Sequence, residues 1–364
     1  MPGKSKENIS SVELWAAMFI LITAVAMTAL FGTHARNQSW ISVIIATIFS
    51  LVFALIYTHL SDSNSGKSIV EIGELLLGKW GGKFIGLLYA WFTFEICSFI
   101  MRDNLQMTST VALHNTPSIV IAITAIIMAL WITYEGIETI CRLSTFVIPF
   151  LVSFLLIAFI LLSKDFNFNN FLPLTDIKWR KVMYSGLHGS IHPLSMPALF
   201  VMIFPSLTKK GQAKVPTLFA VAAAGLVILL ANIMYILVLG PLVPKLSYPG
   251  YTAYSYIEVA DFIDRAELLF YTLFLVMNIL ELSIAFYVSA LCLAKVFGIN
   301  NYRVLLIPLG FLVVEWTFVF TKNNAEFLKF VVYTYSWYAM IYEVLIPLFL
   351  LILSAIRKRK KSAA

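Results

Sequence analysis

The sequence predicts an all-α integral membrane protein with ten transmembrane helices. Hydrophobic residues make up 60% of the chain and charged residues 12%, and the mean hydropathy is +0.88, whereas about a quarter of an ordinary soluble domain is charged. Crossing the hydrocarbon layer takes about 20 apolar residues. Runs of this kind lie near residues 12–33, 40–60, 84–112, 118–136, 144–163, 185–205, 217–240, 267–296, 303–321 and 333–356.

The third and eighth runs are longer than a span needs, which indicates tilt or extension beyond the membrane. Ten spans place both termini on one side. Of the 26 Lys and Arg residues, 16 lie on that side, nine lie on the other, and Arg102 lies within a span. Because Lys and Arg concentrate in cytoplasmic loops, both termini are predicted to face the cytoplasm. The basic tail Arg357–Lys361 fits this orientation and is expected to contact anionic membrane lipid, so the net charge of +7 requires no nucleic-acid partner.

The polar connection at residues 164–184 divides the chain into five helices before it and five after it. No charge block or Gly/Ser-rich linker separates the two halves, so residues 1–364 are predicted to form a single integral-membrane domain. Five helices followed by five is the layout of transporter folds built from two inverted repeats. In such folds the first helix of each repeat is interrupted.

The sixth run carries the signals of a broken helix. Pro193 and Pro197 each remove a backbone donor and clash with the preceding turn, and Gly186 and Gly189 lower the steric cost of leaving helical geometry. In hydrocarbon such a break is tolerated where protein or water satisfies the freed backbone groups, which is usually at a binding site near the midplane. The segment is therefore predicted to bind a ligand; the alternative is a proline-kinked helix that only packs.

Ionisable residues within a span face the protein interior or water. In the third run, Glu95 and Arg102 are seven residues apart, with Phe99 between them. Arg102 lies about 10 Å further toward the outside at 1.5 Å per residue, so a structural ion pair requires both long side chains to reach toward each other. Glu95 is predicted to contribute to a ligand or proton site, and its neutralisation by Arg102 is the alternative.

In the eighth run, Asn278 and Glu281 are three residues apart and share one helical face. Glu281 lies near the centre of the run, so it is the second candidate carboxylate of a ligand or proton site. The alternative is a protonated, hydrogen-bonded packing residue. Glu315 and Glu343, in the ninth and tenth runs, are equally compatible with interhelical hydrogen bonding.

Catalysis and metal binding find little support in the sequence. His188 and His192 are four residues apart and could share a helical face, but zinc needs a further ligand and Pro193 disrupts the turn. The chain has no Gly-rich phosphate loop, nucleophile elbow or HExxH motif. The three cysteines, at positions 97, 141 and 292, have no metal-binding or redox spacing. We therefore expect neither enzymatic activity, nor a cofactor, nor a metal.

Several strings of the chain recur in one known family. The third-helix region contributes Leu76-Leu77-Gly78-Lys79-Trp80-Gly81 and Ile85-Gly86-Leu87-Leu88-Tyr89, followed by Arg102 and Thr116-Pro117. Further matches are Gly136 through Arg142-Leu143, Asn170-Phe171-Leu172-Pro173, Phe204-Pro205 and Phe297-Gly298. With these strings the chain resembles the permease-like B subunits of GerA-type spore germinant receptors. The resemblance covers essentially the whole chain, and its specificity rests on the order and spacing of these motifs together.

The resemblance implies a LeuT/APC-like fold, that of the amino-acid/polyamine/organocation transporters. It also implies residence in the inner membrane of a bacterial spore, assembly with A and C subunits, and binding of a small nutrient, expected to be an amino acid. The expected ligand-binding residues are Thr28, Gly32, Glu95, Phe99, Gly189, Ser190, His192, Pro193, Ser195, Pro197, Asn278 and Glu281. Helix one has only Gly32 where such permeases have a Gly-rich break.

Three functions remain open at this point. The first is a nutrient-sensing receptor subunit, and the second is an ion-coupled amino-acid transporter that uses the same pocket. The third is a scaffold that only holds partner subunits in the membrane. Two midplane carboxylates favour the first two functions over a scaffold.

Overall fold

The computed structural model describes residues 7–28, 31–172, 176–209, 211–257, 265–320 and 324–362. These residues are almost entirely helical, and the bridge between Ile9 and Leu207 is their only β pairing. The α-helices are α1 (Ser11–Thr28), α2 (Ser39–Ser63), α3 (Ile69–Val111), α4 (Ser118–Glu135), α5 (Ile137–Leu162), α6 (Trp179–Ile191), α7 (Lys214–Leu239), α8 (Pro249–Tyr254), α9 (Ala266–Phe297), α10 (Leu306–Val319), α11 (Asn324–Phe330), α12 (Ser336–Met340) and α13 (Ile346–Ser362).

Shorter turns join these helices. The 3-10 segments are η1 (Thr33–Gln38), η2 (Ser163–Asp165), η3 (Phe168–Phe171), η4 (Met196–Met202), η5 (Phe204–Ser206), η6 (Gly240–Lys245) and η7 (Tyr302–Leu305). Two π-helical segments, η8 (Val331–Tyr335) and η9 (Ile341–Leu345), interrupt the last long helix on either side of α12.

The described residues contain eight helical segments that are long and apolar enough to cross a membrane. The first apolar helix is shorter, and α6 has only 13 residues before it is interrupted. A multi-pass membrane protein is therefore confirmed. The count of ten spans remains a prediction, because the two interrupted helices fall short of a full span. The third helix also begins earlier than predicted, at Ile69, and bends at Gly78, whose φ is +82°.

Both interrupted helices end close to a residue that disfavours regular helix, a glycine after helix one and a proline after α6. The prediction of a broken sixth helix is confirmed: α6 ends at Ile191, and the chain continues through Pro193 into the 3-10 turns η4 and η5. Helix one is interrupted as well. It ends at Thr28, Gly32 adopts the left-handed φ of +78°, and η1 follows. Gly32 suits this conformation because it has no Cβ.

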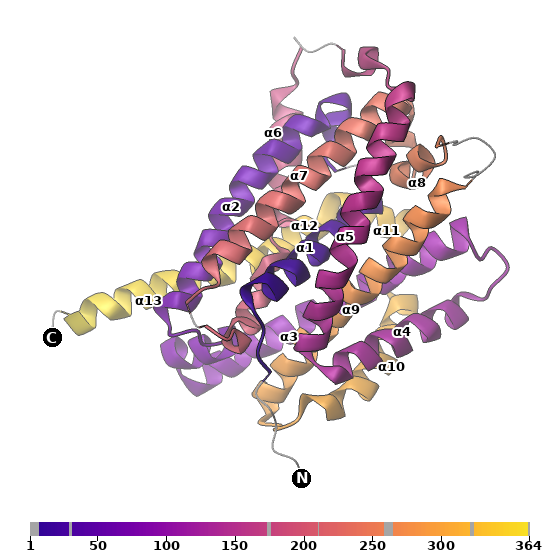
Figure 1. Cartoon of the computed structure of the whole chain (residues 1–364). Coiled ribbons are helices and arrows are strands. Elements are labelled where there is room, and N and C mark those ends of the chain that lie inside the picture. The colour runs from indigo at the N-terminus through magenta and orange to yellow at the C-terminus, as the bar shows by residue number, and fades with distance from the viewer. Residues whose placement is uncertain are drawn as a thin grey trace.

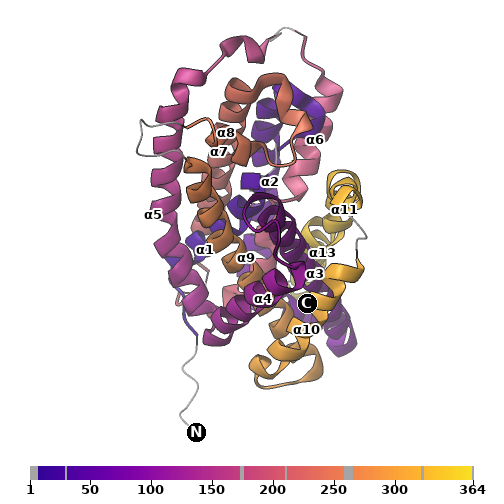
Figure 2. The ribbon, with the colours of Figure 1, turned by 90° about the vertical axis from the view of Figure 1, so that its right-hand side faces the viewer.

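The first interrupted helix and the turn η4 that follows α6 lie inside the bundle. In Figure 1, α1 lies between α5 and α7, and it also contacts α9. The two long helices α3 and α9 pack against each other along much of their length, and α2 packs against α6 and α7. Figure 2 shows α5 on one side of the bundle and the C-terminal helices on the other. The breaks in α1 and α6 are therefore enclosed by continuous helices.

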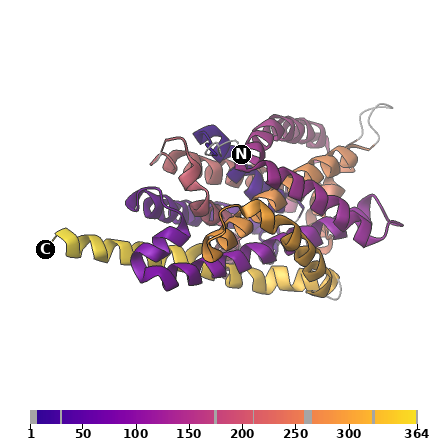
Figure 3. The same cartoon turned by 90° about the horizontal axis from the view of Figure 1, so that it is seen from below.

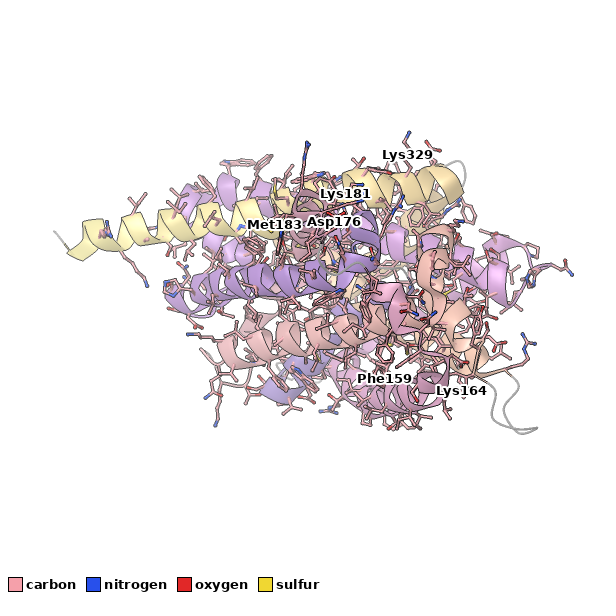
Figure 4. The ribbon with its side chains drawn as sticks, turned by 90° about the horizontal axis from the view of Figure 1, so that it is seen from above. Phe159, Lys164, Asp176, Lys181, Met183 and Lys329 are labelled. Atoms are coloured by element: carbon pink, nitrogen blue, oxygen red, sulfur yellow. The ribbon has the colours of Figure 1, made fainter. Side chains whose placement is uncertain are left out.

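The ends of the bundle are more polar than its middle. Lys164 and Asp176 lie in the connection between α5 and α6, and Lys181 lies in the first turn of α6 (Figure 4). The sequence predicts that this connection lies on the side opposite both termini. At the other end of the chain, α13 projects beyond the bundle (Figure 3). It carries the basic residues Arg357–Lys361, and the guanidinium of Arg357 hydrogen-bonds the carbonyl of Leu75.

Candidate ligand-binding site

Two cavities meet at His192, which directly follows α6. The first, here called the imidazole cavity, has a volume of about 130 Å³. Its walls include Gly32, His34, Ser185, His188, Gly189 and His192. The second, here called the carboxylate cavity, has a volume of about 120 Å³. Its walls include Phe99, Asp103, His192, Asn278, Glu281 and Tyr335. Val25, His192 and Val331 line both cavities, so the two are adjacent.

The carboxylate cavity holds a buried acid with an unused oxygen. Glu281 is 1% exposed, and its Oε1 has no hydrogen-bond partner among the described residues. Asp103 lines the same cavity and is the charged group that acts most directly on Glu281. An ionised acid without a partner is unfavourable in a membrane interior. The unused oxygen of Glu281 therefore favours a ligand with a cationic, hydrogen-bond-donating group.

A hydrogen-bond network between α3 and α9 fixes the position of Asn278. The Nδ2 of Asn104 donates to the Oδ1 of Asn278 at 3.0 Å, and the hydroxyl of Thr108 lies 3.4 Å from the Oδ1 of Asn104. Tyr271 in turn donates to Thr108 at 2.9 Å. Because Asn278 is held in this way, Glu281, one turn further along α9, is held at a fixed height in the cavity.

The imidazole cavity is lined by ring nitrogens that have no partner. The Nε2 atoms of His34 and His188 and the Nδ1 of His192 are buried without a hydrogen bond among the described residues. The ring centroids of His34 and His188 are 6.5 Å apart, and the Nδ1 of His188 lies 3.1 Å from the hydroxyl of Ser336. The part of the chain that the structure describes contains no cluster of three or more side chains arranged to hold a metal ion.

Neighbouring side chains satisfy the backbone groups that the breaks expose. The Nδ2 of Asn232 donates to the carbonyl of Phe31 at 3.0 Å. The carbonyl of Ser190 accepts from the hydroxyls of Ser50 at 3.0 Å and of Ser195 at 2.5 Å. These bonds explain how two interrupted helices persist in a membrane protein. They also mean that the carbonyl of Ser190 is already occupied by protein donors.

The structure divides the residues that the sequence grouped into one pocket. Gly32, Gly189 and Pro193 line the imidazole cavity, Phe99, Asn278 and Glu281 line the carboxylate cavity, and His192 lines both. Ser190, Ser195, Pro197 and Glu95 are not among the lining residues of either cavity. Thr28 ends α1, but its side chain lies outside the described part of the structure. Ligand binding by these residues stays a prediction.

The alternative of an ion pair between Glu95 and Arg102 is not among the ion pairs of the described residues. Glu95 instead accepts a hydrogen bond from the hydroxyl of Tyr338, and the structural role of Arg102 stays a prediction. The physical reason is distance: Arg102 lies two turns further along α3, whereas Tyr338 on the facing α12 is adjacent. Glu95 therefore ties α3 to the last helix.

Sequence reasoning missed several residues of the two cavities, namely His34, Asp103, Tyr248, Phe327 and Tyr335. Asp103 follows Arg102 directly and lies four residues after Phe99, so the helical spacing could have placed it on the cavity wall. Tyr248 comes from the connection between η6 and α8 and carried no such signal. Its hydroxyl has no partner among the described residues. Burial, and then the nearby Asp103, raise the pKa of Tyr248, so this hydroxyl stays a neutral donor.

A larger cavity of about 590 Å³ opens at the opposite end, close to the N-terminal segment. Several of its charged and polar groups pair with each other. Tyr287 donates to Glu7 at 2.7 Å, and Arg303 lies 3.7 Å from the same carboxylate. Backbone bonds from Ile9 to Ser206 and from Thr208 to Ile9 tie the N-terminal segment across the end of η5. Because these charges already have partners, this cavity is a weaker candidate for ligand binding than the imidazole and carboxylate cavities.

Comparison with known proteins gives consistent matches. A family described as "Spore germination protein" matches residues 8–327. Spore germination protein KB of Bacillus subtilis is 23% identical, over 98% of this chain and 97% of that protein. Spore germination protein A2 of the same organism is 27% identical, over 88% and 87%.

Solved transporter structures show the same fold at low sequence identity. MhsT in complex with L-phenylalanine superimposes with a TM-score of 0.64 at 14% identity, covering 97% of this chain and 90% of that one. The nucleobase-cation symporter Mhp1 in a closed conformation gives a TM-score of 0.59 at 12% identity, covering 92% and 76%. The predicted LeuT/APC-like fold is therefore confirmed.

Proposed function

Because the chain belongs to the spore germination protein family, we propose that it is the nutrient-binding B subunit of a spore germinant receptor. In this proposal it resides in the spore inner membrane with both termini on the core side. It binds a small nutrient in the carboxylate cavity and signals to A and C subunits. The relatives are germination proteins of comparable length, which supports the receptor role.

The single observation that carries the ligand assignment is the free oxygen of Glu281 in the carboxylate cavity. A ligand ammonium would donate to this oxygen and relieve the buried charge. The Tyr248 hydroxyl, which has no partner among the described residues and lines the same cavity, would donate to a ligand carboxylate. One acceptor and one donor on a small cavity fit an α-amino acid, and MhsT shows that this fold can hold L-phenylalanine.

An ion-coupled amino-acid transporter is the second candidate. It is supported by the transporter structures that share the fold and by the large cavity at the opposite end of the bundle. A transporter moves labelled substrate into sealed vesicles that contain the purified chain alone, whereas a receptor subunit only binds it. This measurement separates the two candidates.

The ligand class is tested by titrating the purified chain with amino acids, sugars and nucleosides while following thermal unfolding. A ligand that binds only the folded state raises its apparent stability by about 2.7 kcal/mol at one hundred times Kd. We expect one or more amino acids to stabilise the chain. Stabilisation by sugars or nucleosides alone would contradict the proposal.

A further inference from the structure

A further buried carboxyl group, that of Glu343, lies apart from both cavities. Glu343 is 0% exposed and lies within the π-helical turn η9 of the last long helix. It lines neither the imidazole cavity nor the carboxylate cavity. π-Helical turns inside longer helices are frequently found at functional sites. The ligand-binding role proposed above does not use this residue.

Neither oxygen of the Glu343 carboxyl group has a hydrogen-bond partner among the described residues. The ion pairs in that part of the chain do not include Glu343 either. An ionised carboxylate without a hydrogen bond or a counter-charge is strongly disfavoured in a low-dielectric interior. A neutral carboxylic acid avoids this cost and gains a donor.

The charge of Glu343 acts on phenols from three elements, namely Tyr57 on α2, Tyr89 on α3 and Tyr335 in η8. The hydroxyl of Tyr89 donates to the carbonyl of Tyr342 at 2.6 Å. Glu343 hydrogen-bonds none of the three phenols, because both of its oxygens are without a partner among the described residues.

We propose that Glu343 is a proton-binding site in the core of the bundle, next to the break in helix six. A proton from bulk water adds to one carboxylate oxygen to give the neutral acid, and no other bond is made or broken. The choice of a proton over a metal cation rests on the small number of oxygens present. Glu343 has no hydrogen-bond partner among the described residues, and those residues hold no metal-ligating cluster.

The site is connected to both the break and the carboxylate cavity. The turn η9 packs against η4, and Tyr57 lies beside Ser195, which precedes η4. Tyr335 lies within range of both Glu343 and Glu281 and lines the carboxylate cavity, and its ring is 4.5 Å from that of His192. A movement of the last helix that admits water to η9 would release the proton. Proton occupancy is thereby linked to the shape of the break.

Infrared difference spectroscopy of the full-length chain in lipid nanodiscs tests the site at neutral pH. Protonated carboxyl groups give a C=O stretching band that ionised carboxylates lack, and the band shifts in D2O. We expect Glu343→Gln to remove one such band. The control Glu315→Gln, which alters an exposed carboxyl group on α10, should keep that band. A spectrum of Glu343→Gln that retains every protonated-carboxyl band of the wild type would overturn the proposal.

Two further measurements keep the test decisive if Glu343→Gln folds poorly. Tyr57→Phe retains the acid and removes only a neighbouring hydroxyl that does not hydrogen-bond it, so the same band should persist. Loss of the band in Tyr57→Phe would contradict the site as described. Replacing N-methylglucamine by Na⁺ or K⁺ should leave the wild-type band intact, whereas its loss would show that the site takes an alkali cation instead of a proton.

Discussion

The imidazole cavity and the carboxylate cavity meet at His192 but are built in different ways. The first is formed largely by the interrupted segments, through Gly32, Gly189 and the turn after α6. The second draws its two carboxyl groups and the amide of Asn278 from the continuous helices α3 and α9. The breaks thus create space, and the continuous helices place charge at a defined depth. A ligand that needs a counter-charge should therefore bind in the carboxylate cavity. The sequence, in contrast, placed the binding site at the breaks, which line the imidazole cavity.

The largest loss of stability and of ligand response should come from adding a side chain where the break in helix one packs against α6. A Cβ added at Gly189 would lie 1.9 Å from the Cζ of Phe31. Phe31 is 7% exposed, and its carbonyl is held by Asn232, so the ring has little freedom to move. We expect Gly189→Ala to destabilise the chain by about 1–3 kcal/mol, as overpacking typically does, and to abolish ligand-induced stabilisation. Thermal unfolding with and without ligand measures both effects.

The control for this prediction is the double variant Gly189→Ala with Phe31→Ala. Removing the ring removes the clash, so the two changes should be coupled and the double variant should be more stable than the sum of the single changes predicts. Strictly additive losses would show that the two breaks do not depend on this contact.

The next largest effect should come from Glu281. Glu281→Gln keeps the size of the side chain and deletes its charge. A hydrogen bond to a charged group contributes about 1.5–3 kcal/mol, which corresponds to a loss of about 10- to 150-fold in affinity. Isothermal titration with the amino acid that best stabilises the wild type measures this loss. Wild-type affinity in this variant would return Glu281 to a packing role.

The smallest effect should come from the matched change in the other cavity. His188→Gln alters a lining residue of the imidazole cavity, but this residue is not among those that line the carboxylate cavity. We expect the affinity for the same amino acid to stay within about threefold of wild type, or about 0.7 kcal/mol. A larger loss for His188→Gln than for Glu281→Gln would reverse the roles of the two cavities.

Much of the fold follows from local sequence signals. The apolar runs predict most of the membrane-spanning helices, because the thickness of the hydrocarbon layer sets the length of each run. The two prolines of helix six predict its break, because each proline lacks a backbone donor at its own position. The shared face of Asn278 and Glu281 likewise follows from their spacing. The partner of Glu95 could not be predicted, because Tyr338 lies 243 residues away and reaches it only through helix packing. Tyr248 and Tyr335 also reach the carboxylate cavity only through the packing of segments that are distant in the sequence. The lack of a partner for Glu343 depends on the same packing, so the sequence could not predict it.

The most direct test is an electron cryo-microscopy structure of the full-length chain with its most stabilising amino acid bound. Our account predicts ligand density in the carboxylate cavity, with the amino group within hydrogen-bond distance of Glu281 and the body of the ligand beside Asn278 and Tyr335. Density confined to the imidazole cavity, among His34, His188 and Gly189, would contradict it.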